Sequence, residues 1–548
     1  MCFEVRHEDL MGRVGVIETK SGRFETPALI PVINPAIQPV SPGEMRELMG
    51  FEAVMTNAYI LMKNYGQKAA ELGVHGLLGF DGVVATDSGA YQLLVYGRVD
   101  IGPDDVVAYQ EAIGTDIATI LDVPTGWTSS RQEALRTVLE TAERGRRLWE
   151  VKRRDDILWV GPVQGGRFTD LVARSAKLMG SLPFDIHALG SPTPVMEAYK
   201  FDVLVDMIVA AKTNLPPERP LHLFGAGHPI TFALAVALGC DTFDSAAYAI
   251  YARDGRYMTE HGTARLEELA YLPCDCPVCA RRDPSDLLEL PEEERTRLLA
   301  LHNLYVCARE VRAIRQAIIE GRLWEHLVLR AHSHPAVLSA VRRLARYAKL
   351  LEERSPVGGK RGIFIFSSLD LHRPELVRHR ERLLERFSPV GRDLLILLPP
   401  PPQKPLSRSP EYDILVEVLS SSLGPSWPYK VSVSTYMVPF GPVPLELDQL
   451  HPLAQHEVAE PDEAMLSWAA ALVADYVRSK QFRAVLLLSD GGFLARAVER
   501  ECRRACAELG VPLEVLVADE PWSREALSGL ARQAASLLSR LGASRGEA

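Results

Sequence analysis

The sequence predicts an α/β protein that begins with a (β/α)8 barrel and continues into a smaller α/β domain. Two observations predict the barrel: eight short, mostly apolar runs lie between residue 28 and about residue 245, and longer segments with helical periodicity separate them. Barrel strands are buried on both sides, so they should form continuous apolar runs of this kind. The runs are ALIPVIN, AVMTN, GVVATDSG, ATILD, LWVGPVQ, IHALG, LHLFGAG and DTFDS.

Polar residues stand at the C-terminal ends of these predicted strands. Barrel enzymes build their active sites at this end, from the segments that follow the strands. A single aspartate there could equally cap a helix or start a turn. Three carboxylates and two amides at one end of one barrel favour a site instead. The residues at the strand ends are Asn57, Asp87, Asp122, Gln164, Gly190, Gly225 and Asp244.

A cysteine cluster follows the predicted barrel. Cys274, Cys276 and Cys279 lie within six residues, and His302 follows on an expected helix. Such clustering indicates a metal site rather than disulfides, and three thiolates with one imidazole suit tetrahedral zinc. Four protein ligands leave no open position, so we expect one structural Zn²⁺ per chain. An iron–sulfur site would prefer a fourth cysteine, and Cys307 keeps that alternative open.

The C-terminal part of the sequence has the features of a second α/β domain. It contains the strand-like runs IFIFSS, LLILL, YKVSVS and AVLLLS, with helical segments around 464–480 and 493–508. The segment LPPPPQKPLSRSP is too rich in proline for a helix or a central strand, so it is expected to be an exposed loop.

A turn-rich stretch, SPVGGKRG, separates the two parts and is typical of a domain linker. The chain has 548 residues, 47% of them hydrophobic, which is enough for one large core and at least one further domain. The predicted division is a barrel domain at 1–350 that includes a zinc subdomain at about 265–350, a linker at 351–362, and a C-terminal domain at 363–548.

Composition limits the partners of this protein. Its formal net charge of -10 argues against a generally basic surface, so any RNA binding should come from local patches. No basic N-terminal region precedes an apolar run, and no run of about 18 apolar residues occurs. We therefore expect a cytoplasmic protein without a membrane partner.

Five motifs follow one another along the first 350 residues. They are DSGAYQ at 87–92, GPVQGG at 161–166, HALG at 187–190, FDSA at 243–246, and the cysteine pattern with LHNLY at 301–305. In this order they resemble the motifs of tRNA-guanine transglycosylases. The alanine and tyrosine after Asp-Ser-Gly, and a C-terminal module with LELD at 445–448 and PLAQH at 452–456, resemble the archaeal branch.

The resemblance implies a reaction. The archaeal branch exchanges guanine at position 15, in the D-arm of tRNA, for 7-cyano-7-deazaguanine (preQ0), a step in archaeosine biosynthesis. Breaking the N-glycosidic bond develops positive charge on the ribose, which a carboxylate can trap as a covalent ester. A second carboxylate can give the departing base a proton and later remove one from the incoming base. By resemblance Asp244 is the nucleophile and Asp87 transfers the proton, although the sequence alone leaves open which aspartate is alkylated.

The resemblance also implies how the base is bound. Asp122 would accept hydrogen bonds from N1 and the 2-amino group of guanine, and Gln164 would bind O6 or the 7-substituent. Tyr91 would stack on the base, with an ordinary core aromatic as the alternative. The expected substrate-binding residues are Asp122, Gln164, Ala188, Gly190, Ser88 and Tyr91.

A basic surface should hold the phosphates that flank the flipped nucleotide. Arg309, Arg312 and Arg315 are spaced by three and so share one face of an expected helix. A charge run of this kind is often only a solvated face, which is the alternative here. Further candidates are Arg322, Arg342, Arg343 and Arg346.

Archaeal members commonly end in a small RNA-binding PUA domain, which is not recognisable in this sequence. A separate PUA-type protein is therefore an expected partner, together with tRNA, guanine and preQ0, and the family precedent favours a homodimer. One alternative is a non-catalytic tRNA-binding subunit, although such a chain could dispense with the three aspartates. Another is a deazaguanine transglycosylase acting on another nucleic acid. A zinc-dependent hydrolase fits poorly with a coordinatively full metal site.

Overall fold

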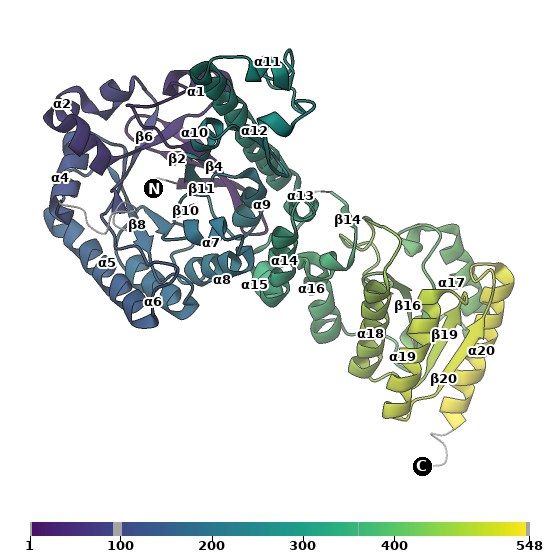
Figure 1. The fold of residues 1–548 in the computed structure, drawn as a ribbon. Coiled ribbons are helices and arrows are strands. Elements are labelled where there is room, and N and C mark those ends of the chain that lie inside the picture. The colour runs from purple at the N-terminus through teal and green to yellow at the C-terminus, as the bar shows by residue number, and fades with distance from the viewer. Residues whose placement is uncertain (1–2, 91–100, 360, 544–548) are drawn as a thin grey trace. The chain divides into compact units, whose positions relative to one another are not determined.

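The computed structural model describes residues 3–90, 101–359 and 361–543 (Figure 1). The chain divides into two compact units, residues 1–345 and 346–548.

The first unit is built around a closed barrel of eight parallel strands, which confirms the predicted fold class. The sheet order is β4-β11-β10-β9-β8-β7-β6-β5, and its two end strands meet where Val32 pairs with Met55 in parallel. The amide of Ile33 donates to the carbonyl oxygen of Met55 at 2.7 Å there. Each strand overlaps one of the predicted runs, and only β7 begins outside its run, one residue before ATILD. The strands are β4 (Ala28–Pro31), β5 (Ala53–Asn57), β6 (Val83–Asp87), β7 (Ile117–Thr119), β8 (Leu158–Val163), β9 (Ile186–Leu189), β10 (Leu221–Leu223) and β11 (Thr242–Ser245).

Helices cover the outside of the barrel (Figure 1). Several begin at clear start signals: Ser130 caps α5, and Glu133 completes a capping box by bonding back to the Ser130 amide. The inner face of α5 is apolar and buried, whereas its outer face carries charged residues. The helices are α1 (Pro42–Met49), α2 (Ala58–Leu78), α4 (Pro103–Ala112), α5 (Arg131–Val151), α6 (Thr169–Gly180), α7 (Thr193–Glu197), α8 (Phe201–Lys212) and α9 (Pro229–Ala237).

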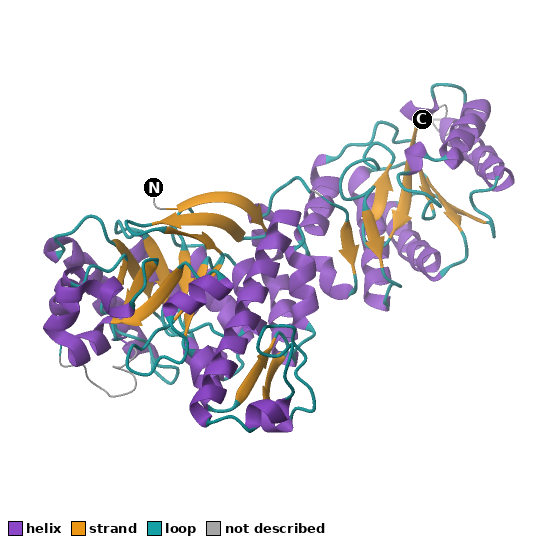
Figure 2. Cartoon of the chain, turned by 90° about the horizontal axis from the view of Figure 1, so that it is seen from above, coloured by secondary structure: helices purple, strands orange, loops and turns teal. Residues whose placement is uncertain are grey.

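An antiparallel sheet that the sequence analysis missed covers the N-terminal end of the barrel. Its strands are β1 (Phe3–Asp9), β2 (Gly12–Glu18) and β3 (Arg23–Thr26), beginning near the point marked N in Figure 2. Ile17 and Phe24 join one buried cluster with apolar residues of the barrel strands. This sheet therefore closes the barrel core at the end opposite the predicted site.

A buried ion pair joins this sheet to the barrel. The Arg13 guanidinium donates to both oxygens of Asp241, with Nε–Oδ1 at 2.9 Å and Nη2–Oδ2 at 2.5 Å. Asp241 directly precedes β11, and its Oδ2 also accepts from the Leu221 amide at 2.8 Å. The Asp241 side chain has no exposed area, so the pair fixes the base of β10 and β11 in a solvent-free environment.

The region after β11 forms the subdomain that carries the cysteine cluster. A hairpin of β12 (Arg256–Thr259) and β13 (Gly262–Arg265) precedes the cysteines, and α11 (Pro284–Leu288) follows them. The long helix α12 (Glu292–Glu320) then packs along the barrel, with a face of buried apolar residues from Leu298 to Ile318. The remaining helices are α10 (Ala247–Arg253), α13 (Leu323–Ala331) and α14 (Pro335–Arg343).

The second unit is an α/β domain, as predicted. Its main sheet has the order β17-β16-β15-β19-β20 and is parallel except for β17. The four predicted runs contain β14, β15 and β19 and overlap β16, which continues three residues beyond YKVSVS, whereas β17, β18 and β20 were not predicted. The strands are β14 (Ile363–Ile365), β15 (Leu394–Leu398), β16 (Val431–Met437), β17 (Gly441–Pro444), β18 (His456–Val458), β19 (Val485–Ser489) and β20 (Leu513–Val517).

Helices line both faces of this sheet in two separate apolar clusters. They are α15 (Ala348–Arg354), α16 (Pro374–Glu381), α17 (Pro410–Leu423), α18 (Glu463–Lys480), α19 (Phe493–Leu509) and α20 (Arg524–Ala543). Among the described residues of the chain, none of the helices is both long and apolar enough to cross a membrane.

The Arg13–Asp241 pair yields a stability prediction. Replacing Arg13 by methionine removes the bidentate partner of the buried Asp241 carboxylate and leaves the more distant Lys212 ammonium, 3.8 Å from Oδ2, so the free energy of unfolding should fall by about 3 kcal/mol. Urea unfolding of the full chain, followed by circular dichroism, measures the change. Arg131→Met is the matched control, because the Arg131–Asp170 pair is exposed on both sides and its loss should leave the unfolding midpoint unchanged. Equal midpoints for the two variants would contradict the prediction.

Candidate active site and metal centre

The barrel brings three aspartates to the C-terminal ends of its strands. Asp87 ends β6, Asp122 lies three residues beyond β7, and Asp244 lies in β11. Burial raises the pKa of Asp87 to about 7, and the negative charges of Asp122 and Asp244 contribute to this rise. The three carboxylates therefore lie close enough for Asp122 and Asp244 to raise the pKa of Asp87.

Neutral donors hold the Asp87 carboxylate. The Asn57 side-chain amide donates to Asp87 Oδ2 at 2.8 Å, and the Gly89 amide donates to the same oxygen at 3.2 Å. Asn57 is itself fixed, because its Oδ1 caps α2 by accepting from the Ile60 amide at 3.0 Å. Gly89 has a φ of 94°, which an L residue rarely adopts, so glycine suits this turn. With a pKa of about 7, Asp87 can both give and take a proton near neutral pH.

Asp244 is held through only one of its two oxygens. Its Oδ1 accepts from the Gly225 amide at 2.9 Å and from His222 Nε2 at 3.0 Å. Among the residues that the structure describes, Oδ2 accepts no hydrogen bond. The carboxylate is thus held through Oδ1, and its side chain keeps 14% of its area exposed.

A buried network fixes the orientation of the Gln164 amide. Gln164 Oε1 accepts from the Thr125 amide at 3.0 Å and from the Ser191 hydroxyl at 3.1 Å. Gln164 Nε2 donates to Asp122 Oδ2. A backbone N–H can only donate and a carboxylate mainly accepts, so the amide oxygen and nitrogen cannot be exchanged here. Burial raises the pKa of Asp122 to about 6, and the bond from Gln164 opposes that rise.

The other predicted substrate-binding residues occupy varied positions. Gly190 lies against Gln164, and a Cβ atom there would stand only 2.1 Å from the Gln164 amide nitrogen. The Gly190 amide donates to the Val163 carbonyl at 2.8 Å and so belongs to the sheet. Ala188 is fully buried within β9. The buried Ser88 hydroxyl has no hydrogen-bond partner among the described residues. The predicted Tyr91 lies outside the described residues.

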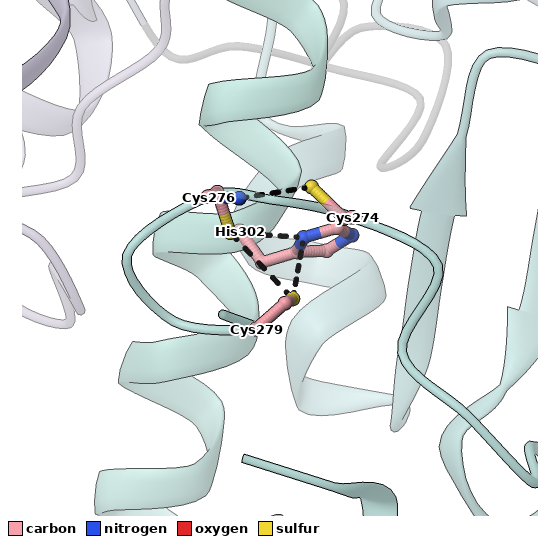
Figure 3. A group of neighbouring side chains, drawn as sticks. All are labelled: Cys274, Cys276, Cys279 and His302. Carbon is pink, nitrogen blue, oxygen red and sulfur yellow. Dashed lines mark hydrogen bonds between the residues drawn. The ribbon is translucent and has the colours of Figure 1, made fainter. Parts of the chain in front are cut away.

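The three cysteines and the histidine converge in the second cluster, which can hold a metal ion. Their ligand atoms all lie within 4.8 Å of one another, and Figure 3 shows the side chains pointing toward a common centre. Cys276 Sγ lies 3.5 Å from Cys279 Sγ, and His302 Nδ1 lies 3.5 and 3.4 Å from these two sulfurs. Tetrahedral zinc would separate two sulfurs by about 3.8 Å and a sulfur from a nitrogen by about 3.6 Å. The donor set and its spacing therefore fit a tetrahedral ion.

Neighbouring groups orient the histidine of this cluster. His302 Nε2 donates to the Met258 carbonyl oxygen at 2.8 Å, which leaves the Nδ1 lone pair for a metal. The imidazole stacks on the Tyr257 ring with a centroid separation of 3.7 Å. Cys307, which kept an iron–sulfur site open, is not part of the cluster. Its sulfur instead lies 3.7 Å from the Gly227 carbonyl oxygen.

The three arginines predicted to bind RNA lie on α12 and have partners within the first unit. Arg309 pairs with Glu260 at 2.6 Å, and Arg312 donates to the Met49 carbonyl at 3.2 Å. Arg315 donates to the backbone oxygens of Glu25 and Pro27, at 2.6 and 3.0 Å, so it fastens α12 to the end of β3. Arg309 and Arg312 remain exposed, whereas Arg315 is half-buried.

Sequence reasoning missed several residues that shape the barrel site. Asn57 and Gly225 were noted only as strand-end residues, and Thr125, Ser191 and His222 were not singled out. A signal existed for His222, because it is the polar residue in an otherwise apolar strand, LHLF. Thr125 and Ser191 gave no signal, since polar residues in loops are ordinary.

In a comparison with known proteins, both parts of the chain match a family model. The model of the family described as queuine tRNA-ribosyltransferase matches residues 9–336, and a domain of unknown function matches residues 376–534. The tRNA-guanine(15) transglycosylase of Sulfolobus acidocaldarius is 46% identical over 69% of this chain and 76% of its own length. That of Aeropyrum pernix is 49% identical over 73% and 80% of the two chains. That of Saccharolobus solfataricus is 42% identical over 89% and 96%, so the similarity extends through the second unit.

The cluster geometry predicts a metal-dependent fold of the subdomain. Cys276→Ser removes one ligand, so the purified protein should lose its bound metal and unfold at a lower temperature than the wild type. Elemental analysis and thermal unfolding measure the two effects. Cys307→Ala, a buried cysteine outside the cluster, is the control and should keep the metal. Full metal content in Cys276→Ser would show that the cluster is not the metal site.

Proposed function

The chain belongs to the queuine tRNA-ribosyltransferase family, and from this premise we propose that it exchanges guanine 15 of tRNA for preQ0. The relatives named tRNA-guanine(15) transglycosylase support the position in tRNA. One observation carries the proposal: three aspartates lie at the C-terminal ends of the barrel strands. Asp244 has an oxygen that accepts no hydrogen bond from the described residues, and Asp87 has a pKa near 7. A non-catalytic subunit would not need this arrangement.

In the first half of the proposed reaction, Asp244 is the nucleophile. Its free Oδ2 bonds to C1′ of the ribose while the bond from C1′ to guanine N9 breaks. The electron pair of that bond stays on N9, which takes a proton from Asp87. The products are free guanine and a ribosyl ester of Asp244.

The second half reverses these steps with a different base. Asp87, now ionised, takes the proton from N9 of preQ0, and N9 attacks C1′. The ester bond breaks and returns the electron pair to the Asp244 carboxylate. Two inversions at C1′ give net retention, and the base exchange needs neither ATP nor a redox cofactor.

The Gln164 network supports a base with acceptor groups at O6 and C7. The Gln164 oxygen is already bound by Thr125 and Ser191, and one Gln164 N–H donates to Asp122, so one N–H remains for substrate. A nitrile nitrogen and a carbonyl oxygen both accept hydrogen bonds. Ionised Asp122 complements them by accepting from N1 and the 2-amino group. The buried Ser88 hydroxyl is a further group that could form a hydrogen bond with the edge of the base.

The cysteine cluster is assigned to structural Zn²⁺ in this proposal. Its three thiolates and one imidazole fill a tetrahedral shell, so the ion would fasten the cysteine loop to α12 rather than bind substrate. We assign phosphate contacts to Arg309 and Arg312, whose side chains remain exposed on α12. The family resemblance supports a homodimer and a separate PUA-type protein as partners.

Guanine exchange tests the proposed function. Full-length protein with unmodified tRNA and radiolabelled guanine should place label at position 15. Asp244→Asn should lower the rate by about 10⁴-fold or more, because it removes the nucleophile. Asp87→Asn should lower it by about 10²- to 10⁴-fold. The control Asp155→Asn changes an aspartate with 95% exposure and should exchange at the wild-type rate. Label at another position, or exchange in Asp244→Asn, would reject the assignment.

The two raised pKa values predict how pH affects the reaction. Asp87 must be protonated to cleave the glycosidic bond, so formation of the ester should slow as pH rises through about 7. Asp122 must be ionised to accept from guanine, so the KM for guanine should rise as pH falls below about 6. Single-turnover rates and steady-state KM values between pH 5 and pH 9 measure these effects separately. Ester formation that is independent of pH across this range would contradict the role of Asp87.

A further inference from the structure

We propose that His222 is a positioning residue that holds Asp244 ready for attack on C1′. The inference deepens the proposed function and rests on the assignment of Asp244 as the nucleophile. His222 lies in β10 and Asp244 in β11, the neighbouring strand, where His222 pairs in register with Thr242. Because Thr242 and Asp244 are two residues apart on one strand, their side chains share the same face of the sheet. The imidazole can therefore contact both.

The hydrogen bonds fix which ring nitrogen carries the proton. His222 Nε2 lies 3.0 Å from Asp244 Oδ1, and an ionised carboxylate only accepts, so Nε2 must donate. His222 Nδ1 lies 2.9 Å from the Thr242 hydroxyl, which can donate to it. An imidazole with its proton on Nε2 thus satisfies both neighbours. Thr242 acts as the group that sets this tautomer.

The two donors to Asp244 act together. The Gly225 amide and His222 Nε2 both bind Oδ1, and both come from the same segment, the end of β10 and the turn that follows. A carboxylate held at one oxygen by two fixed donors has restricted rotation, which keeps Oδ2 available to the ribose. Preorganisation of this kind favours the attack itself rather than the binding of the base.

The surroundings of His222 agree with this role. Its side chain is only 5% exposed, and Asp244 is its hydrogen-bond partner. The ring packs edge-on against Phe224 at 4.9 Å and lines a small cavity inside the barrel together with apolar residues such as Ile30 and Met55. A polar ring in such a place needs hydrogen-bond partners, and Thr242 and Asp244 supply them.

Two amide substitutions separate positioning from general stability. Gln places its Nε2 close to the imidazole Nε2, whereas Asn reaches only as far as Nδ1. His222→Gln should therefore keep the bond to Asp244, and His222→Asn should lose it. We expect kcat for guanine exchange within about 3-fold of the wild type for Gln, and about 10- to 100-fold lower for Asn, the loss of one hydrogen bond to a charged group. The KM for guanine and the unfolding temperature should be similar in the two variants.

Thr242→Val gives an independent test that leaves the histidine in place. It removes the hydroxyl that bonds Nδ1 while keeping the side-chain shape, and kcat should fall about 3- to 10-fold, the loss of one neutral hydrogen bond. If the His222 variants do not fold, the Thr242→Val variant alone tests whether His222 positions Asp244. Equal kcat values for Gln and Asn, a loss confined to KM, or a wild-type rate in Thr242→Val would each overturn the proposal. If the wild-type protein itself exchanges no guanine, the proposed function fails instead, so the two failures are distinguishable.

Discussion

Closure of the eight-stranded sheet is the constraint on which the rest of the structure depends. In sheet order β11 stands second and β6 seventh, so an open sheet would keep Asp244 and Asp87 far apart. The parallel pairing of Val32 with Met55 joins the two end strands, and the C-terminal ends then form a ring. The sheet β1–β3 closes the opposite end, where Ile17 and Phe24 pack against apolar residues of the barrel strands.

Three like charges at one mouth repel each other, and the structure stabilises them with neutral donors. Among the described residues, none of the three aspartates forms an ion pair with a lysine or arginine. Asn57 donates a hydrogen bond to Asp87, and Gln164 donates one to Asp122. Asp244 accepts hydrogen bonds from the Gly225 amide and from His222. A nearby cation would keep the carboxylates ionised at all useful pH values. Neutral donors instead leave the pKa of Asp87 free to rise to about 7, where it can exchange protons.

The sequence was informative where one physical rule acts locally. Burial on both faces produces continuous apolar runs, which is why all eight barrel strands could be predicted, and the carboxyl-end rule then selected the aspartates. The sheet β1–β3 was not predicted, because its strands contain both polar and apolar residues. In β3, for example, exposed and buried residues alternate. The role of His222 was not predicted for a different reason. Its role depends on the register between β10 and β11, and register is a property of the fold that no single strand contains.

The arginines of α12 show what the spacing of charged residues in a sequence can predict and what it cannot. Spacing by three correctly predicts one helix face, but it cannot tell what that face contacts. All three arginines contact the protein itself. Arg315 donates to backbone oxygens of Glu25 and Pro27, Arg309 pairs with Glu260, and Arg312 donates to the Met49 carbonyl. Arg309 and Arg312, nearer the cysteine loop, remain exposed. If the metal cluster fixes the start of α12 through His302, it also fixes where these two charges stand relative to the barrel mouth. On the proposed assignment of phosphate contacts to Arg309 and Arg312, a metal held by this cluster would influence RNA binding through the position of α12.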